Sequence, residues 1–86
     1  MYPSMRNMSN KFIFITGCST GIGLDAVTTL KTRGYDVLAS CRSAYDVGVL
    51  ITRGIDCIQL DLASSESIQN AIAEIREHGQ LYGLIN

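Results

Sequence analysis

The chain has 86 residues, of which 47% are apolar and 17% are charged, and it carries a formal net charge of -1. This length allows one small domain or part of a larger one, since domains commonly have roughly 100 to 150 residues. The balanced charge disfavours a nucleic-acid partner, the apolar fraction excludes a disordered chain, and no apolar run approaches the roughly 20 residues that a membrane-spanning helix needs.

Residues 1–10 are polar and lack the apolar segment and the cleavage site of a secretory signal. We therefore expect a flexible lead and a cytoplasmic location for the protein. The first residue of the folded part is expected to be Lys11, where an apolar run begins.

The first two predicted elements are a buried strand and an amphipathic helix. Residues 12–16 form a continuous β-branched and aromatic run that ends at Gly17, which is typical of a strand buried on both faces of a parallel sheet. The helix is indicated by apolar residues at helical spacing and by Gly34 as a left-handed stop. These apolar residues are Ile22, Ala26, Val27 and Leu30.

The same alternation of strand and helix continues along the chain. Residues 37–41 and 55–60 are short and mostly apolar, and they predict a second and a third strand. Between them, Ser43 is expected to start a short helix with a capping-box-like pattern, and Gly54 is expected to end it.

A third helix and the opening of a fourth strand complete the pattern. Ser64 is the expected N-cap of this helix, Gly79 its stop, and residues 81–86 look like the fourth strand. Strands that alternate with helices at this spacing predict βαβ units with right-handed crossovers. The fold class is therefore α/β, with an incomplete, Rossmann-like three-layer parallel sheet in the order βαβαβαβ.

The turn between the first strand and the first helix is rich in glycine. Its sequence is T-G-C-S-T-G-I-G, from Thr16 to Gly23. Glycines at such a turn let phosphates approach the backbone, whose N–H groups and helix dipole attract an anion, and Ser19 and Thr20 add hydroxyl donors. The spacing G-x-x-x-G-x-G departs from the G-x-G-x-x-G fingerprint, and a P-loop is excluded because no Gly-Lys-Ser/Thr follows.

This turn resembles the cofactor turn of the short-chain dehydrogenases and reductases, whose pattern is T-G-x-x-x-G-I-G. The matching residues are Thr16, Gly17, Gly21, Ile22 and Gly23. The resemblance continues to residues 84–86, which are similar to the start of the family's L-x-N-N-A-G segment. It implies a partial dinucleotide-binding (Rossmann) domain over residues 11–86, a nicotinamide dinucleotide cofactor, and hydride transfer between carbonyl and alcohol in the full-length family.

The residues at the end of the second strand favour NADP(H) over NAD(H). An acidic side chain that accepts from the ribose 2′-OH is expected about 20 residues after the glycine turn, and Cys41 and Arg42 stand there instead. No carboxylate repels a 2′-phosphate at this point, and the guanidinium of Arg42 suits one. The resemblance implies that Ser19 also contacts this phosphate.

The resemblance implies roles for three further residues. Asp61 would accept a hydrogen bond from the adenine amino group, Leu62 would pack near the adenine ring, and Asn86 would lie beside the cofactor. On the residues alone, Asp61 is nearly as typical of a plain turn and Asn86 of a chain end.

The family's catalytic Ser and Tyr-x-x-x-Lys are not found in this sequence. None of the tyrosines has a lysine four positions later; they are Tyr2, Tyr35, Tyr45 and Tyr82. We therefore expect a truncated oxidoreductase that is inactive and marginally stable alone, whose partner is a missing carboxy-terminal half or a second copy. The alternative is a stand-alone nucleotide-binding or regulatory module without catalysis. A third hypothesis is a methyltransferase-like fold that binds S-adenosylmethionine. It would leave Arg42 without a role, because S-adenosylmethionine has no phosphate.

No metal site is expected. Cys18, Cys41 and Cys57 are far apart and lack a Cys-x-x-Cys spacing, so we predict that they are small buried side chains. His78 stands beside Gly79 at the end of a helical pattern, where capping of the helix is expected rather than metal ligation.

Overall fold

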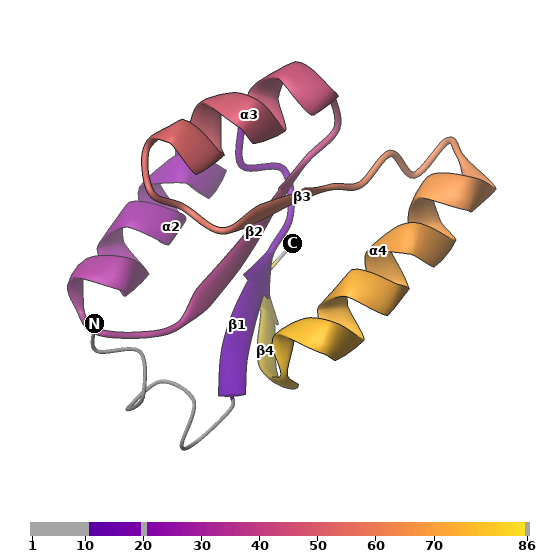
Figure 1. Ribbon diagram of the computed structural model, residues 1–86. Coiled ribbons are helices and arrows are strands. Elements are labelled where there is room, and N and C mark those ends of the chain that lie inside the picture. Colours follow the sequence, from indigo (N-terminus) through magenta and orange to yellow (C-terminus); the bar gives the residue numbers. More distant parts are fainter. Residues whose placement is uncertain (1–10, 20, 86) are drawn as a thin grey trace.

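The computed structural model describes residues 11–19 and 21–85. The predicted lead at residues 1–10 and two candidate site residues, Thr20 and Asn86, lie outside the described residues. The elements are β1 (Lys11–Ile15), α2 (Gly21–Thr32), β2 (Val37–Cys41), α3 (Ala44–Thr52), β3 (Cys57–Gln59), α4 (Ser65–His78) and β4 (Gln80–Ile85). Strands and helices alternate along the described chain, as the sequence predicts (Figure 1).

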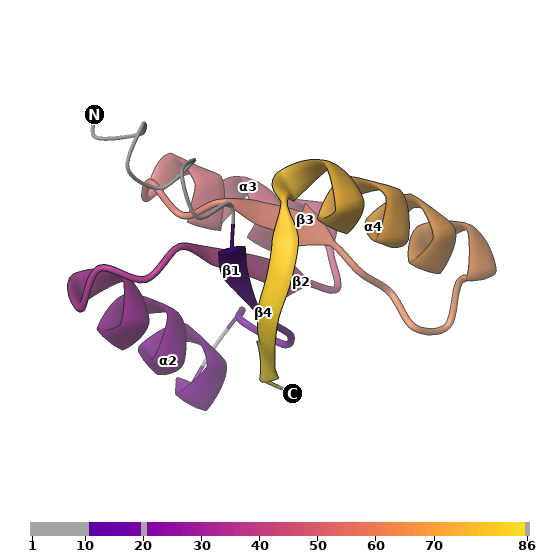
Figure 2. The same cartoon turned by 90° about the horizontal axis from the view of Figure 1, so that it is seen from below.

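The four described strands form one parallel sheet in the order β3-β2-β1-β4. Helices α2 and α3 lie on one face of this sheet, and α4 lies on the other (Figures 1 and 2). This arrangement confirms the predicted α/β class and the Rossmann-like three-layer sheet, with the fourth strand beside the first.

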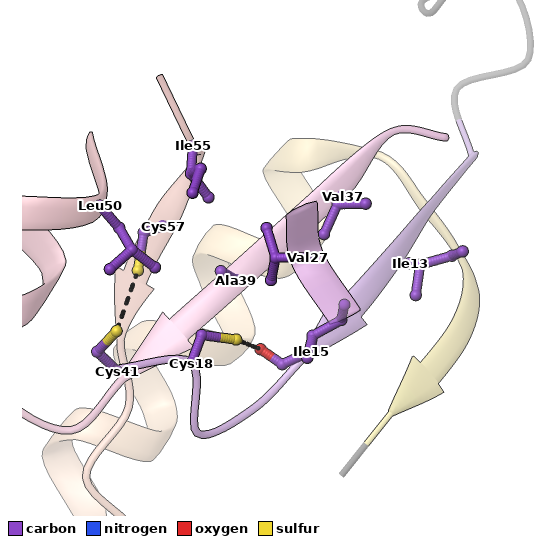
Figure 3. Packing of buried hydrophobic residues seen from close by; sticks show 10 residues of the cluster. All are labelled: Ile13, Ile15, Cys18, Val27, Val37, Ala39, Cys41, Leu50, Ile55 and Cys57. Atoms are coloured by element: carbon purple, nitrogen blue, oxygen red, sulfur yellow. Dashed lines mark hydrogen bonds between the residues drawn. The ribbon is translucent and has the colours of Figure 1, made fainter. Parts of the chain in front are cut away.

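Strand β1 supplies side chains to both faces of the sheet, because successive residues of a strand point to opposite sides. Ile13 and Ile15 belong to the core beneath α2 and α3, where Val27 and Leu50 are the buried helix residues (Figure 3). Phe12 and Phe14 belong to the core on the other face, against α4. The unbroken apolar run of this strand is thus explained by burial on both sides, as predicted.

The expected helix boundaries are confirmed by their capping contacts. The Oγ atom of Ser43 accepts from the amide of Asp46 at 3.2 Å, and the Oγ atom of Ser64 accepts from the amide of Ser67 at 3.1 Å. The glycine after α3, Gly54, has a φ of 84° and so adopts the left-handed conformation that ends helices.

Two local predictions are corrected by the structure. The third strand covers only Cys57–Gln59 rather than residues 55–60. The amide of Ile55 donates to the carbonyl of Leu50, so Ile55 belongs to the turn that follows α3. Ile22 does not share the buried face of its helix, since it is 89% exposed in the first turn of α2.

Strand β4 pairs with β1 along one side and with no other described strand. Its side chains are largely exposed, including Tyr82 and Leu84. Among the described residues, no helix combines the length and the apolar character that crossing a bilayer would require.

Candidate functional site

The candidate site residues gather at the carboxyl edge of the sheet, because the strands are parallel and end at the same side. The glycine turn follows β1, Arg42 follows β2, and Asp61 and Leu62 follow β3. Ligands of open α/β sheets bind at this edge. The topology therefore brings together residues that are up to 45 positions apart in the sequence, from Gly17 to Leu62.

The glycines of the turn are required for different physical reasons. Gly17 and Gly21 have φ values of 67° and 61°, a region that side chains other than glycine rarely adopt. Gly23 is required by space: a Cβ atom there would overlap the carbonyl oxygen of Gly17 and would lie 3.0 Å from the carbonyl carbon. The first turn of α2 thus packs directly against the backbone of the glycine turn.

The glycine turn is held in place from inside. The amide of Cys18 donates to the carbonyl of Ser40 in β2 at 2.9 Å, and the Cys18 thiol donates to the carbonyl of Ile15 at 3.1 Å. The Cys18 side chain is fully buried and points into the core (Figure 3). Gly17 and Ser19, on either side of it, are exposed, so the turn presents alternate residues to a ligand.

The two residues at the end of β2 have opposite environments. Cys41 is 1% exposed, and its Sγ atom lies 3.7 Å from that of Cys57 in the core (Figure 3). The Arg42 side chain is 82% exposed. Of this pair, therefore, only Arg42 offers a side chain to a ligand, and Cys41 contributes packing.

Asp61 combines two contacts. Its Oδ1 atom accepts a hydrogen bond from the amide of Ala63 at 3.0 Å, and this bond forms the turn that leads towards α4. The same Oδ1 atom lies 3.7 Å from Nε of Arg42. The turn role and the site role that the sequence left open are thus compatible in one side chain. Leu62, the next residue, is 76% exposed, a large apolar side chain at the same edge.

Sequence reasoning missed Gln59. This residue is the exposed last position of β3, and its Nε2 atom donates to the carbonyl oxygen of Arg42 at 3.1 Å. The available signal was a polar side chain that ends an otherwise apolar strand. The contact itself joins residues that are 17 positions apart, and no local pattern reveals it.

The cysteine thiols are inert by position. Burial raises the pKa of the Cys18, Cys41 and Cys57 thiols above the ordinary value of 9.0, because a thiolate would lose its hydration in the core. As the pH rises, the thiols of the unfolded chain therefore lose their protons at a lower pH than those of the folded protein. Where the folded state holds more protons than the unfolded state, the free energy of unfolding falls as the pH rises.

We expect the free energy of unfolding to fall progressively above about pH 9 because of the cysteines, and to be unaffected by them below that pH. Urea unfolding of the wild type and of Cys57→Ala between pH 7 and 10.5 measures this. The variant should lose less stability over the alkaline range, after the packing cost of the substitution is subtracted at pH 7. Equal alkaline losses in both proteins would contradict the assignment to Cys57.

A second polar cluster lies at the opposite edge, where β2 and β3 begin. His78, the last residue of α4, places Nε2 3.5 Å from Oδ1 of Asp36 and packs its ring edge-on against Phe12, with centroids 4.6 Å apart. With Asp56 these groups place three ligand-type atoms within 4.8 Å of one another. Asp36 and Asp56 each make further polar interactions. Nε2 of His78 is buried and has no hydrogen-bond partner among the described residues, so the imidazole and the Asp36 carboxylate are close neighbours between the end of α4 and the start of β2. The capping role of His78 stays a prediction.

Comparisons with known proteins agree with this architecture. A family model described as short chain dehydrogenase matches residues 11–86. The chain is 41% identical over 78 residues to an uncharacterized oxidoreductase of Escherichia coli, YbbO, covering 88% of this chain and 29% of that protein. It is 36% identical over 84 residues to the human retinol dehydrogenase 5, covering 91% of this chain and 26% of that protein.

A third relative carries a cofactor in its name. The chain is 33% identical over 81 residues to the NADPH-dependent 1-acyldihydroxyacetone phosphate reductase of Schizosaccharomyces pombe, covering 91% of this chain and 27% of that protein. The chain thus spans less than a third of the length of each of these relatives. No solved structure gives a significant match.

Proposed function

The chain belongs to the short-chain dehydrogenase family, and from that premise we propose that residues 11–86 form the NADP(H)-binding, amino-terminal part of an oxidoreductase. One observation carries the proposal: an open glycine turn at the start of α2 shares the carboxyl edge of the sheet with an exposed arginine, Arg42, at the end of β2. Family members bind nicotinamide dinucleotides, and the preference for NADP(H) is the finer claim.

The glycine turn fits a pyrophosphate. Chain neighbours apart, no atom of the described residues lies within 4 Å of the position of a Cβ at Gly17 or Gly21, so this surface is open to a ligand. The first amides of α2 lack helical partners and, with the helix dipole, favour negative charge. Ser19 is exposed beside them and supplies a hydroxyl donor. Thr20 is proposed for the same role and lies outside the described residues.

Arg42 suits a 2′-phosphate on the adenosine ribose. Its contact with Asp61 uses Nε, so the two terminal nitrogens, which carry four of the five N–H donors, are not consumed by it. The neighbouring Cys41 is buried and offers no carboxylate to bind the diol of NAD(H). The name of the NADPH-dependent relative supports the same cofactor.

The adenine ring is proposed to lie over the segment after β3. Leu62 is exposed and offers an apolar surface for the ring, and Asp61 offers a carboxylate oxygen to the adenine amino group. Ile22 and Gly23, at the start of α2, are proposed to line the cofactor. Asn86 is assigned beside the cofactor by family resemblance and lies outside the described residues.

The bound cofactor would supply the hydride, and this chain's residues would hold and orient it. No tyrosine of the sequence has a lysine four positions later, so the residues that donate a proton to a carbonyl in the family are not among these 86 residues. We propose that the chain binds cofactor, acts in the cytoplasm, and completes a catalytic site only with a carboxy-terminal half or another subunit.

Titration with NADPH and NADH in parallel tests the cofactor assignment. The wild type should bind NADPH more tightly, and Arg42→Ala should weaken NADPH binding roughly 10- to 100-fold, the loss expected for charge-assisted hydrogen bonds to a phosphate, while NADH affinity stays within about twofold.

Arg33→Ala is the matched control for this titration. It removes the same charge from an exposed position directly after α2, away from the carboxyl edge of the sheet, and both affinities should stay unchanged. Equal affinity of the wild type for the two cofactors would refute the NADP(H) assignment.

A further inference from the structure

Just beyond the ladder between β2 and β3, a side chain of β3 donates a hydrogen bond to the backbone that follows β2. The last register pair is Cys41 with Gln59, and the amide of Leu60 donates to the carbonyl of Cys41 at 2.9 Å. The carbonyl of Arg42, the first residue after β2, accepts a hydrogen bond from the side-chain amide of Gln59 at 3.1 Å. Only alternate residues of a strand bond to a given parallel neighbour, so this carbonyl lies outside the β2–β3 ladder, and the Gln59 side chain supplies a donor to it from β3.

Arg42 is therefore fixed on both sides along the chain. Before it, Cys41 ends β2; after it, Ser43 caps α3, with its carbonyl accepting from the amide of Val47 at 3.2 Å. The Gln59 contact restrains the one peptide group between these elements, at the carbonyl of Arg42. The direction in which the Arg42 side chain leaves the backbone depends on that peptide group.

We propose that Gln59 is a positioning residue for cofactor selectivity: by holding the Arg42 carbonyl, it orients the guanidinium towards the 2′-phosphate. The inference rests on the proposed function. The Arg42 side chain is 82% exposed, and its Nε atom lies 3.7 Å from Oδ1 of Asp61. A long, exposed arginine loses much conformational freedom when it binds a phosphate, and part of that loss is avoided where the backbone is already ordered.

The side-chain N–H of Gln59 is the group that holds the Arg42 carbonyl. Gln59→Met keeps the length of the side chain and its lack of charge but removes the N–H donor. We expect it to weaken NADPH binding roughly three- to tenfold, about the cost of ordering one long side chain on binding, with NADH affinity unchanged within about twofold. The change in the ratio of the two affinities is the decisive readout, because a merely structural role would lower both.

The double variant Arg42→Ala/Gln59→Met separates positioning from direct contact with the cofactor. If Gln59 acts through the guanidinium, the double variant should bind NADPH as Arg42→Ala does, within about twofold. A full additional loss in the Arg42→Ala background would overturn the proposal, as would an unchanged NADPH affinity in Gln59→Met.

Two further variants complete the experiment. Gln69→Met makes the same exchange at an exposed position of α4, and both affinities should remain those of the wild type. Gln59→Leu is a second donor-free variant, to be used if Gln59→Met does not give a folded protein by circular dichroism, and the same selective loss is expected. If Arg42→Ala is itself unselective, the proposed function and this inference both fail; if only the Gln59 variants are unselective, the inference alone fails.

Discussion

Replacing Gly23 with alanine is expected to reduce the affinity for NADPH by roughly 100-fold, which corresponds to about 3 kcal/mol of strain and lost contacts. A Cβ atom at this position would overlap the carbonyl oxygen of Gly17. Gly17 cannot yield easily, because its φ of 67° is already left-handed and the next residue, Cys18, is anchored in the core. The start of α2 must therefore move away from the turn, and its amides with it. Fluorescence titration with NADPH measures the loss.

Gly48→Ala provides the matched control for this substitution. Gly48 lies inside α3, is exposed, and has nothing within 4 Å of the position of its Cβ. The alanine should leave NADPH affinity unchanged and raise the free energy of unfolding by about 0.5–1 kcal/mol, through the higher helix propensity of alanine. A Gly23→Ala protein with the NADPH affinity of the wild type would show that the glycine turn is not the phosphate site.

The fold was accessible from the sequence because its determinants are local. The run from Phe12 to Ile15 is apolar at every position, which only a strand covered on both faces explains, and both faces are covered. Ser43 and Ser64 mark helix starts because a hydroxyl that accepts from a backbone amide is a short-range device. The parallel three-layer sheet was predicted from the alternation of strands and helices and from the right hand of βαβ crossovers.

The details that escaped prediction depend on contacts between distant parts of the chain. The pairing of Arg42 with Asp61 and with Gln59 arises from the register of β2 on β3, which sequence periodicity does not specify. The exposure of Ile22 has a similar origin. Helical spacing places it with the apolar residues of α2, but the buried part of that face is centred on Val27, and the first turn lies outside it.

Among the described residues, the polar side chains at the two edges of the sheet differ in their exposure. At the carboxyl edge, Arg42 is largely exposed and contacts a single carboxylate, that of Asp61, at 3.7 Å. At the amino edge, His78 and Asp36 are mostly buried, between the end of α4 and the start of β2. Side chains enclosed by the fold are less accessible to an outside anion, whereas an exposed guanidinium is suited to bind one. This contrast supports a ligand site at the carboxyl edge.

Phe12→Ala is expected to lower the free energy of unfolding by about 3–5 kcal/mol, the usual cost of emptying a buried phenylalanine site. Phe12 is 1% exposed and packs with Phe14 and Leu38 in the core that α4 covers, and its ring also meets the ring of His78. One helix covers this face, so few side chains can relax into the cavity. Domains commonly have only about 5–15 kcal/mol of stability, so the variant should be partly or wholly unfolded at 37 °C.

Urea unfolding followed by circular dichroism measures this cost, with Ile72→Ala as control on the exposed side of α4, where the loss should be below about 1 kcal/mol. Repeating the urea unfolding with saturating NADPH tests whether the folded variant still binds the cofactor. A ligand that binds only the folded state adds about 2.7 kcal/mol of stability at 100 times its Kd, so NADPH should return much of the Phe12→Ala protein to the folded state. The site lies at the opposite edge from His78 and does not include Phe12, so rescue is expected to survive the substitution. An unfolding midpoint equal to that of the wild type would contradict the burial of Phe12, whereas unfolding without any rescue would count against cofactor binding by the folded chain.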